Sequence, residues 1–235
     1  MPDYRRLLAK LNPRAVNFLG AGGGAPEHTT DDLNGALGMV SDGLGRQLLE
    51  ACWVLGPGHY PTLLMDTMKD MVHKEWTSRR IADEVARLSL HIAEEDLAFR
   101  RNPTHDQKMQ VTRLKLEAEG AKLRAWPYNP EVHVQIRRAV LDEIRGQNHC
   151  ETCQGRESVW DGDLSVTCPE CNGRGFVALS GRKRAEMIGL SEGAIRNTHQ
   201  WVDLYEWLLG RCRQAERYAG EQFERSLGIG LDKAA

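Results

Sequence analysis

Apolar residues recur at intervals of three and four along most of the chain, which is the spacing of one face of an α-helix. A first stripe of this kind covers 33–51 and follows a candidate N-cap at Thr30 or Asp31. The same periodicity predicts a helix over 62–72 and a separate, longer helix over 76–99 with its charges on the opposite face. The pattern therefore predicts a largely helical protein.

Two more helices complete the middle of the chain. Thr104 and Gln107 have the spacing of a capping box and begin a helix that is expected to reach Leu123. A turn rich in proline follows, and Val132 to Ile144 carry the next apolar stripe. We expect residues 30–146 to form one helical region.

The N-terminal segment has a different character. A short helix is expected over 4–11, and the glycine-rich stretch 20–26 comes after it. That stretch lacks the G-K-[ST] sequence and the flanking strand and helix that a phosphate-binding loop needs. Residues 1–29 are therefore predicted to be a flexible arm.

Between 157 and 167 the pattern changes from helical to alternating. Asp161 and Gly162 stand between two short runs of β-forming residues, which is a hairpin signal. We expect Trp160 to lie near the exposed tip of this hairpin.

Two C-x-x-C pairs frame the predicted hairpin: Cys150, Cys153, Cys168 and Cys171. Such pairs place two sulfurs on one tight turn, and two of them close the S4 tetrahedron that structural Zn²⁺ prefers. Gly155 and Gly173 follow the pairs and allow positive φ angles there. The sequence predicts one structural zinc ion without an open coordination position. Two disulfides or four free thiols are the alternatives.

A short basic segment after the cysteines is typical of a helix-turn-helix. Residues 182–188 are expected to form a helix that ends at Gly189, and Ser191 is expected to cap a second helix running to about Arg225. Basic side chains of the first helix would hold phosphates, and polar ones early in the second would face bases. The expected DNA contacts are Arg182, Lys183, Arg184, Glu192, Arg196, Asn197, His199 and Gln200. An ordinary helical pair with a solvated face remains the alternative.

Composition narrows the function classes. The net charge of −2 excludes a protein that coats nucleic acid with its whole surface, so a DNA contact must be local. No signal peptide or membrane span is recognisable, and we expect a reducing cytoplasm. No catalytic motif is present, and no catalytic residue or enzyme activity is predicted.

The order of these features resembles the antitermination protein Q family of lambdoid phages. The residues that carry the resemblance are C-E-T-C-Q-G, C-P-E-C-N-G-R-G-F, S-G-R-K-R-A-E-M-I-G-L-S and W-V-D-L-Y-E-W-L-L-G-R-C, within 150–213. The resemblance implies binding to double-stranded DNA at a late promoter, loading onto paused RNA polymerase, and read-through of terminators. It implies bacterial RNA polymerase as a partner, with the sigma factor as a further candidate. No membrane contact is expected.

The expected fold class is mainly α: a helical bundle with an inserted zinc-binding β-hairpin and a helix-turn-helix. The expected division is an arm at 1–29, a helical region with polymerase contacts at 30–146, a zinc ribbon at 147–178, the helix-turn-helix and C-terminal helix at 179–227, and a frayed tail at 228–235. Two other functions stay open, a zinc-stabilised DNA-binding regulator without a polymerase contact and a co-chaperone-like zinc-knuckle module that binds proteins.

Overall fold

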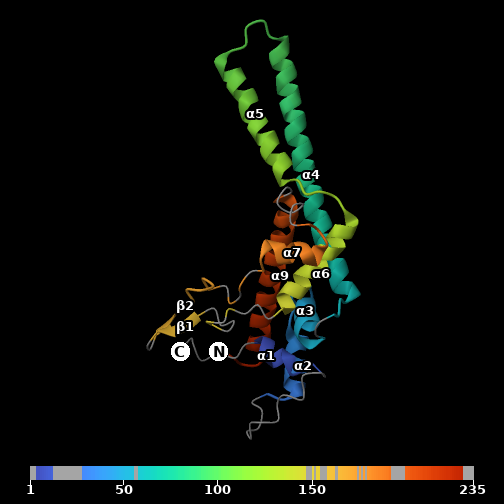
Figure 1. Cartoon of the computed structure of the whole chain (residues 1–235), viewed down its shortest axis with the longest axis vertical. Helices are drawn as coiled ribbons and strands as arrows, with labels where there is room; N and C mark the ends of the chain where they lie inside the picture. The colour runs from blue at the N-terminus through green and yellow to red at the C-terminus, as the bar shows by residue number, and fades with distance from the viewer. Residues whose placement is uncertain are drawn as a thin grey trace.

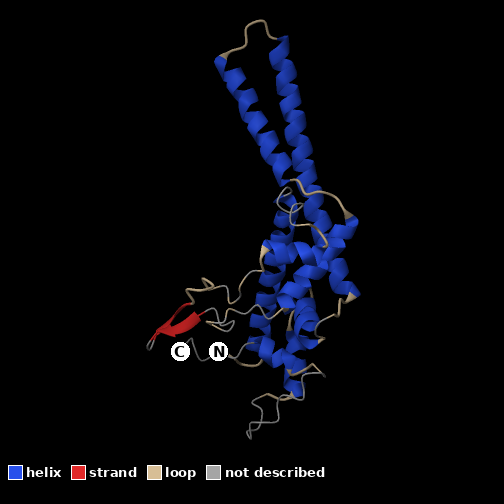
Figure 2. Cartoon of the chain, viewed as in Figure 1, coloured by secondary structure: helices blue, strands red, loops and turns tan. Residues whose placement is uncertain are grey.

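The structure is a computed structural model that describes residues 4–12, 28–55, 58–146, 150, 152–153, 158–161, 164–173, 175, 177, 179–191 and 199–229. It is mainly helical, as the sequence predicts (Figure 2). The helices are α1 (Tyr4–Ala9), α2 (Thr30–Met39), α3 (Leu44–Leu49), the π-helical segment η2 (Glu50–Val54), α4 (Thr62–Phe99), α5 (His105–Arg124), α6 (Pro130–Arg145), α7 (Gly181–Ile188) and α9 (His199–Ser226). The strands are β1 (Ser158–Asp161) and β2 (Leu164–Thr167).

The C-terminal helix α9 is the axis of the bundle, and α1, α2, α3 and α6 pack along it (Figure 1). Its apolar residues enter two buried clusters. The larger one includes Leu204 and Leu208 with Leu64 and Ile136, and the smaller one includes Phe223. At the α3–α9 crossing a Cβ on Gly45 would lie 2.4 Å from the Ala215 carbonyl oxygen, so only glycine fits there.

The short helix predicted over 4–11 is present and packs on the bundle rather than extending from it. Residues Tyr4–Ala9 form α1 and bury Leu7 and Leu8 against the bundle. The Tyr4 backbone N–H donates to the Glu224 carboxylate at 3.1 Å. Two buried leucines and a link to α9 fix this segment, while residues 13–27 lie outside the described part of the chain.

The two helices predicted over 62–72 and 76–99 are one continuous helix, α4, of 38 residues. Nothing between Val72 and Trp76 breaks a helix, because neither glycine nor proline occurs there and the Glu75–Arg79 ion pair at 2.9 Å spans the point. The first part of α4 belongs to the bundle core. Beyond Trp76 the helix leaves the bundle.

The outer part of α4 pairs with α5 to form a projecting two-helix arm (Figure 1). The capping box of Thr104 and Gln107 begins α5, which confirms that prediction. The apolar residues that mark this helix in the sequence are exposed, because α5 covers a different side of α4. The exposed set is Ile81, Val85, Leu88, Ile92 and Phe99.

The predicted hairpin is present. Strands β1 and β2 are antiparallel, with Val159 opposite Val166 and Trp160 opposite Ser165. It stands away from the helices at the side of the bundle (Figure 1). Trp160 is 70 % exposed, as expected for a residue near the tip.

Helix α7 matches the predicted first helix of the helix-turn-helix. The Ser180 hydroxyl accepts the Lys183 N–H, and Gly189 ends the helix with a left-handed φ of 70°. Ala185 and Ile188 are buried in the main core. Residues 192–198, where the second helix was predicted to begin, lie outside the described residues, so the helix-turn-helix stays a prediction.

Candidate metal centre

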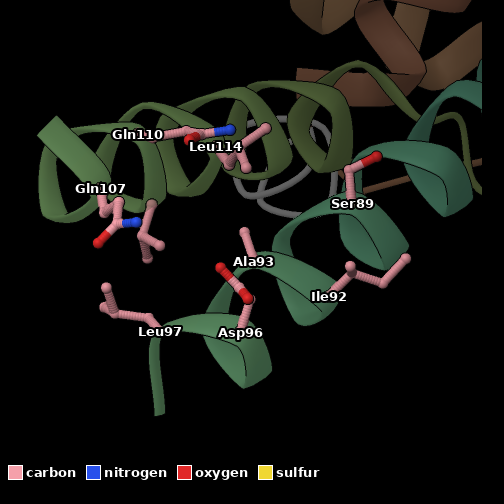
Figure 3. Close-up of a pocket in the computed structure, with 9 residues that line it drawn as sticks. Ser89, Ile92, Ala93, Asp96, Leu97, Gln107, Gln110 and Leu114 are labelled. Carbon is pink, nitrogen blue, oxygen red and sulfur yellow. The ribbon is translucent and has the colours of Figure 1, made fainter. Parts of the chain in front are cut away.

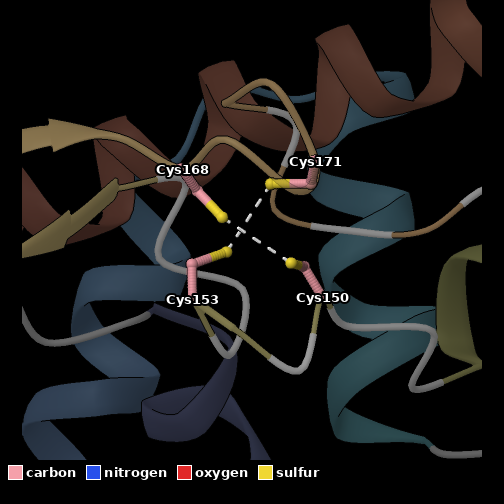
Figure 4. Close-up of side chains that lie close together, drawn as sticks. All are labelled: Cys150, Cys153, Cys168 and Cys171. Carbon is pink, nitrogen blue, oxygen red and sulfur yellow. Dashed lines mark hydrogen bonds between the residues drawn. The ribbon is translucent and has the colours of Figure 1, made fainter.

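The four predicted cysteines come together at the base of the hairpin. Their sulfur atoms point toward one another (Figure 4) and all lie within 4.8 Å of each other. The Cys150 and Cys168 sulfurs are 3.7 Å apart, and those of Cys153 and Cys171 are 3.6 Å apart. A zinc–sulfur length of about 2.3 Å gives tetrahedron edges of about 3.8 Å. The geometry therefore suits a metal ion.

The same distances argue against the disulfide alternative. A disulfide needs a sulfur–sulfur separation of about 2.05 Å. Cys52 and Cys212, the remaining two cysteines, are buried in the helical bundle and are also free. Burial raises the pKa of the Cys52 thiol to about 12, as expected for a packing residue.

Backbone turns hold the second cysteine pair in place. Asn172, Gly173 and Gly175 have left-handed φ angles of 51°, 75° and 74°. The Gly175 N–H donates to the Cys171 sulfur at 3.2 Å, and the Gly175 carbonyl accepts the Cys150 N–H at 3.1 Å. Gly175 therefore links both pairs. The role predicted for Gly173 is confirmed, and Gly155 lies outside the described residues.

The site also favours the thiolate form, which is the form that binds metal. The backbone N–H of Cys153 is the main cause that lowers the pKa of the Cys150 thiol to about 7, with a further contribution from Thr152. All four cysteines are buried. Within the described part of the chain the cluster consists of four cysteines, and a set of four thiol ligands fits a closed structural site rather than one that binds substrate.

Few apolar side chains support this module. Val159 alone, among the described residues, packs against the cysteine cluster, and every residue of β2 is exposed. An isolated hairpin of two four-residue strands cannot bury enough apolar surface to be stable in water. Its stability must come from the cysteine cluster.

Helix α7 is fixed to the bundle by a buried charge network. The Arg184 guanidinium donates twice to the Glu143 carboxylate, both times at 2.9 Å, and once to Glu206 at 3.3 Å. The Tyr205 hydroxyl donates to Glu143 at 2.8 Å, and Arg213 lies 3.5 Å away. Burial and the Glu143 charge raise the pKa of Tyr205.

This network changes the interpretation of one predicted DNA contact. The Arg184 side chain is 12 % exposed and its nitrogens are engaged by carboxylates, so we leave it out of the proposed DNA surface. Arg182 and Lys183 are exposed, and each lies 3.5 Å from the Glu186 carboxylate. Both remain available to phosphates. The partner Glu143 could not be recognised from the sequence, because it is 41 residues away from Arg184.

Of the residues predicted to read bases, the structure describes only those at the C-terminal end of the set. Glu192, Arg196 and Asn197 lie outside the described residues, as does the side chain of His199. The Gln200 amide donates to the Lys122 carbonyl at 3.1 Å, at the end of α5. Thus the structure brings the four predicted metal ligands together, while the DNA set stays a prediction.

A groove on the arm was missed by the sequence analysis. The groove is lined by Ser89, Ala93 and Asp96 of α4 and by Gln107 and Gln110 of α5 (Figure 3). The sequence pattern shows an apolar face on this helix but not what packs against it. Only the position of α5 shows which of its residues stay outside.

Neither a protein-family model, nor a curated protein, nor a solved structure matches the chain. Among the residues that the structure describes, no helix combines the length and the apolar character that a membrane span requires.

Proposed function

We propose that this protein is a transcription antitermination factor that binds DNA near a late promoter and then acts on RNA polymerase. The observation that carries the proposal is the assembled four-cysteine centre followed by the capped basic helix α7. These are the features on which the resemblance to the phage Q family rests, and they occur here in the same order. The proposal includes no catalytic step.

Zinc would be held by Cys150, Cys153, Cys168 and Cys171. When bound, it would supply the cohesion that the hairpin lacks. Arg182 and Lys183 would contact phosphates, and Arg196 and Asn197 would read base edges. The Glu143–Arg184 ion pair would fix the orientation of α7 on the bundle.

The arm supplies the surface proposed for RNA polymerase. Ile81, Leu88 and Ile92 are each at least half exposed on α4, 58 %, 50 % and 66 %. Apolar side chains aligned on one side of a projecting helix are typical of protein contact sites. The arm lies away from the cysteine module (Figure 1), so one chain would bind DNA and polymerase with separate surfaces.

Read-through of a terminator in a purified transcription reaction tests the function. We expect the wild-type protein to raise read-through only on templates that carry its promoter-proximal site. Arg196→Ala and the double variant Arg182→Ala, Lys183→Ala should weaken DNA binding. In the double variant, the DNA affinity should also depend less strongly on salt concentration than in the wild-type protein. Arg87→Ala, an exposed arginine on α4, is the matched control for DNA binding.

A second variant separates the antiterminator from a simple DNA-binding regulator. Ile92→Glu should abolish read-through and polymerase binding while DNA affinity and the melting temperature stay unchanged, because the side chain is exposed. Specific DNA binding without any read-through would favour the regulator. No DNA binding by the zinc-loaded protein would overturn the proposal.

One observation favours a protein-binding zinc module as the second candidate. Trp160 and Leu164 on the hairpin are 70 % and 71 % exposed. Exposed apolar residues on a zinc hairpin suit a peptide contact. If Trp160→Ala abolished a protein interaction while DNA binding were absent, this second function would replace the first.

A further inference from the structure

An elongated pocket lies between the first part of α4 and the first part of α6, with a volume of 520 Å³. We call it the α4–α6 pocket. One end is aromatic and the other is charged. The aromatic end is formed by His73, Trp76, Tyr128 and His133, and the charged end by Asp66, Lys69, Asp70 and Arg137.

The aromatic end is a connected set of rings. The Trp76 and Tyr128 ring centroids are 5.0 Å apart, and Tyr128 lies 5.9 Å from His133. His73 stacks on Trp76 at 5.9 Å. Tyr128 is 62 % exposed, so its ring remains open to a ligand. Burial lowers the pKa of His133, which favours the uncharged imidazole at the aromatic end of the pocket.

Arg137 lies at the floor of the charged end and lacks a partner. It is 8 % exposed, it makes no hydrogen bond or ion pair within the described ranges, and its Nε is buried without an acceptor. Burial lowers the pKa of the Arg137 guanidinium. The nearby charge of Asp66 acts in the opposite direction and is the smaller effect. A buried guanidinium N–H without an acceptor is unfavourable. Its geometry suits a carboxylate or a phosphate.

The distance between the two ends restricts the ligand. His133 and Arg137 are four residues apart on α6, a rise of about 6 Å. A ring stacked at the aromatic end would thus place an anionic group attached to it near Arg137. Asp66 and Asp70 are exposed at the rim and would accept N–H groups of the same ligand.

We propose that the α4–α6 pocket binds a small molecule with a flat aromatic ring, an anionic group about 6 Å from it, and an amino group. A nucleoside monophosphate and an aromatic amino acid share this chemistry. The site is independent of the metal centre and of the proposed DNA surface. A bound ligand would contact α4 at Trp76, where the helix leaves the bundle.

Calorimetric titration of the full zinc-loaded chain tests the site with two probe pairs, AMP with adenosine and tryptophan with tryptamine. The second member of each pair lacks the anionic group. We expect either AMP or tryptophan to bind with one-to-one stoichiometry. Its affinity should be at least about tenfold higher than that of the other member of its pair, because only the anionic probe makes a charge-assisted interaction with Arg137. The pair that binds identifies the ligand source.

Variants assign the binding to this pocket. Arg137→Gln should weaken the anionic probe at least about tenfold and remove the difference within the pair. Arg138→Gln is the matched control, since Arg138 lies over the Tyr60 ring and outside the pocket. Tyr128→Ala changes an exposed ring and should weaken both members, even if Arg137→Gln fails to fold. No binding by either pair, equal binding within the pair that binds, or unchanged affinity in Tyr128→Ala would overturn the proposal.

Discussion

The cysteine module and the helical bundle are stabilised in opposite ways. The bundle buries two large apolar clusters around α9, and even its cysteines Cys52 and Cys212 serve as packing residues. The module has its four cysteines as its only buried centre, with Val159 as apolar support among the described residues. The same residue type thus fills space in one region and offers metal ligands in the other. The two regions should therefore respond differently to the same chemical change.

Loss of one ligand should produce the largest effect. Cys168→Ser should release the metal and unfold the hairpin, because structural zinc binding contributes about 10–16 kcal/mol in small modules. The bundle should keep its helical circular dichroism and its melting temperature. Metal analysis and proteolysis between residues 150 and 175 measure the change. The matched control, Cys52→Ser, should retain the metal and lower the melting temperature, and the reverse pattern would refute the comparison.

The second prediction changes the buried charge network of the bundle. Glu143→Gln leaves Arg184 and Arg213 without their carboxylate, and breaking a buried pair costs about 3–5 kcal/mol. The melting temperature should fall by about 6 °C or more for a chain of this size. Glu206→Gln removes a partner that is 60 % exposed and should change stability by less than about 1 kcal/mol. Equal effects of the two variants would show that the network is not the main support of α7.

A smaller loss is expected where α3 crosses α9. A Cβ at position 45 would come within 2.4 Å of the Ala215 carbonyl oxygen, which belongs to rigid helix backbone. Gly45→Ala should cost about 1–3 kcal/mol by overpacking. Gly35→Ala is the control, because nothing lies within 4 Å of that site, and it should stabilise α2 by up to about 1 kcal/mol. Chemical denaturation measures both, and the metal content should stay unchanged.

The smallest effect concerns acid pH. Burial lowers the pKa of His133 in the folded chain, so the unfolded chain binds more protons once the pH falls below about 6.5. Stability should therefore decrease between pH 7 and pH 5. His133→Gln should reduce this slope in melting experiments. An unchanged slope would mean that other groups cause the acid sensitivity.

The sequence predicted the cysteine module better than the helical layout. The four predicted metal ligands are close in the sequence, because both C-x-x-C pairs lie within 22 residues. The hairpin between the two pairs brings them side by side. The turn at Gly189 and the capping box at Thr104 were predictable for the same reason. The split of α4 was wrong, because the apolar positions over 62–72 and over 76–99 were assigned to two helices although no residue between them breaks a helix.

The parts that could not be predicted depend on distant partners. Arg184 was expected to face DNA, but Glu143 on another helix engages it. Ile81 and Leu88 show the spacing of core residues, and only the placement of α5 decides that they face solvent. The role of Arg137 was not predictable, because its place beside Arg138 in the sequence reveals neither its burial nor its missing acceptor.

The continuity of α4 has a mechanical consequence. Its 38 residues span about 57 Å as one rod, with its base held in the bundle core and its far end at the tip of the arm. A partner that pulls on the tip would apply torque directly to the helices that position α7. The protein would then hold two partners at a fixed distance and a fixed angle. One partner would contact the arm, and the other would bind beside the cysteine module.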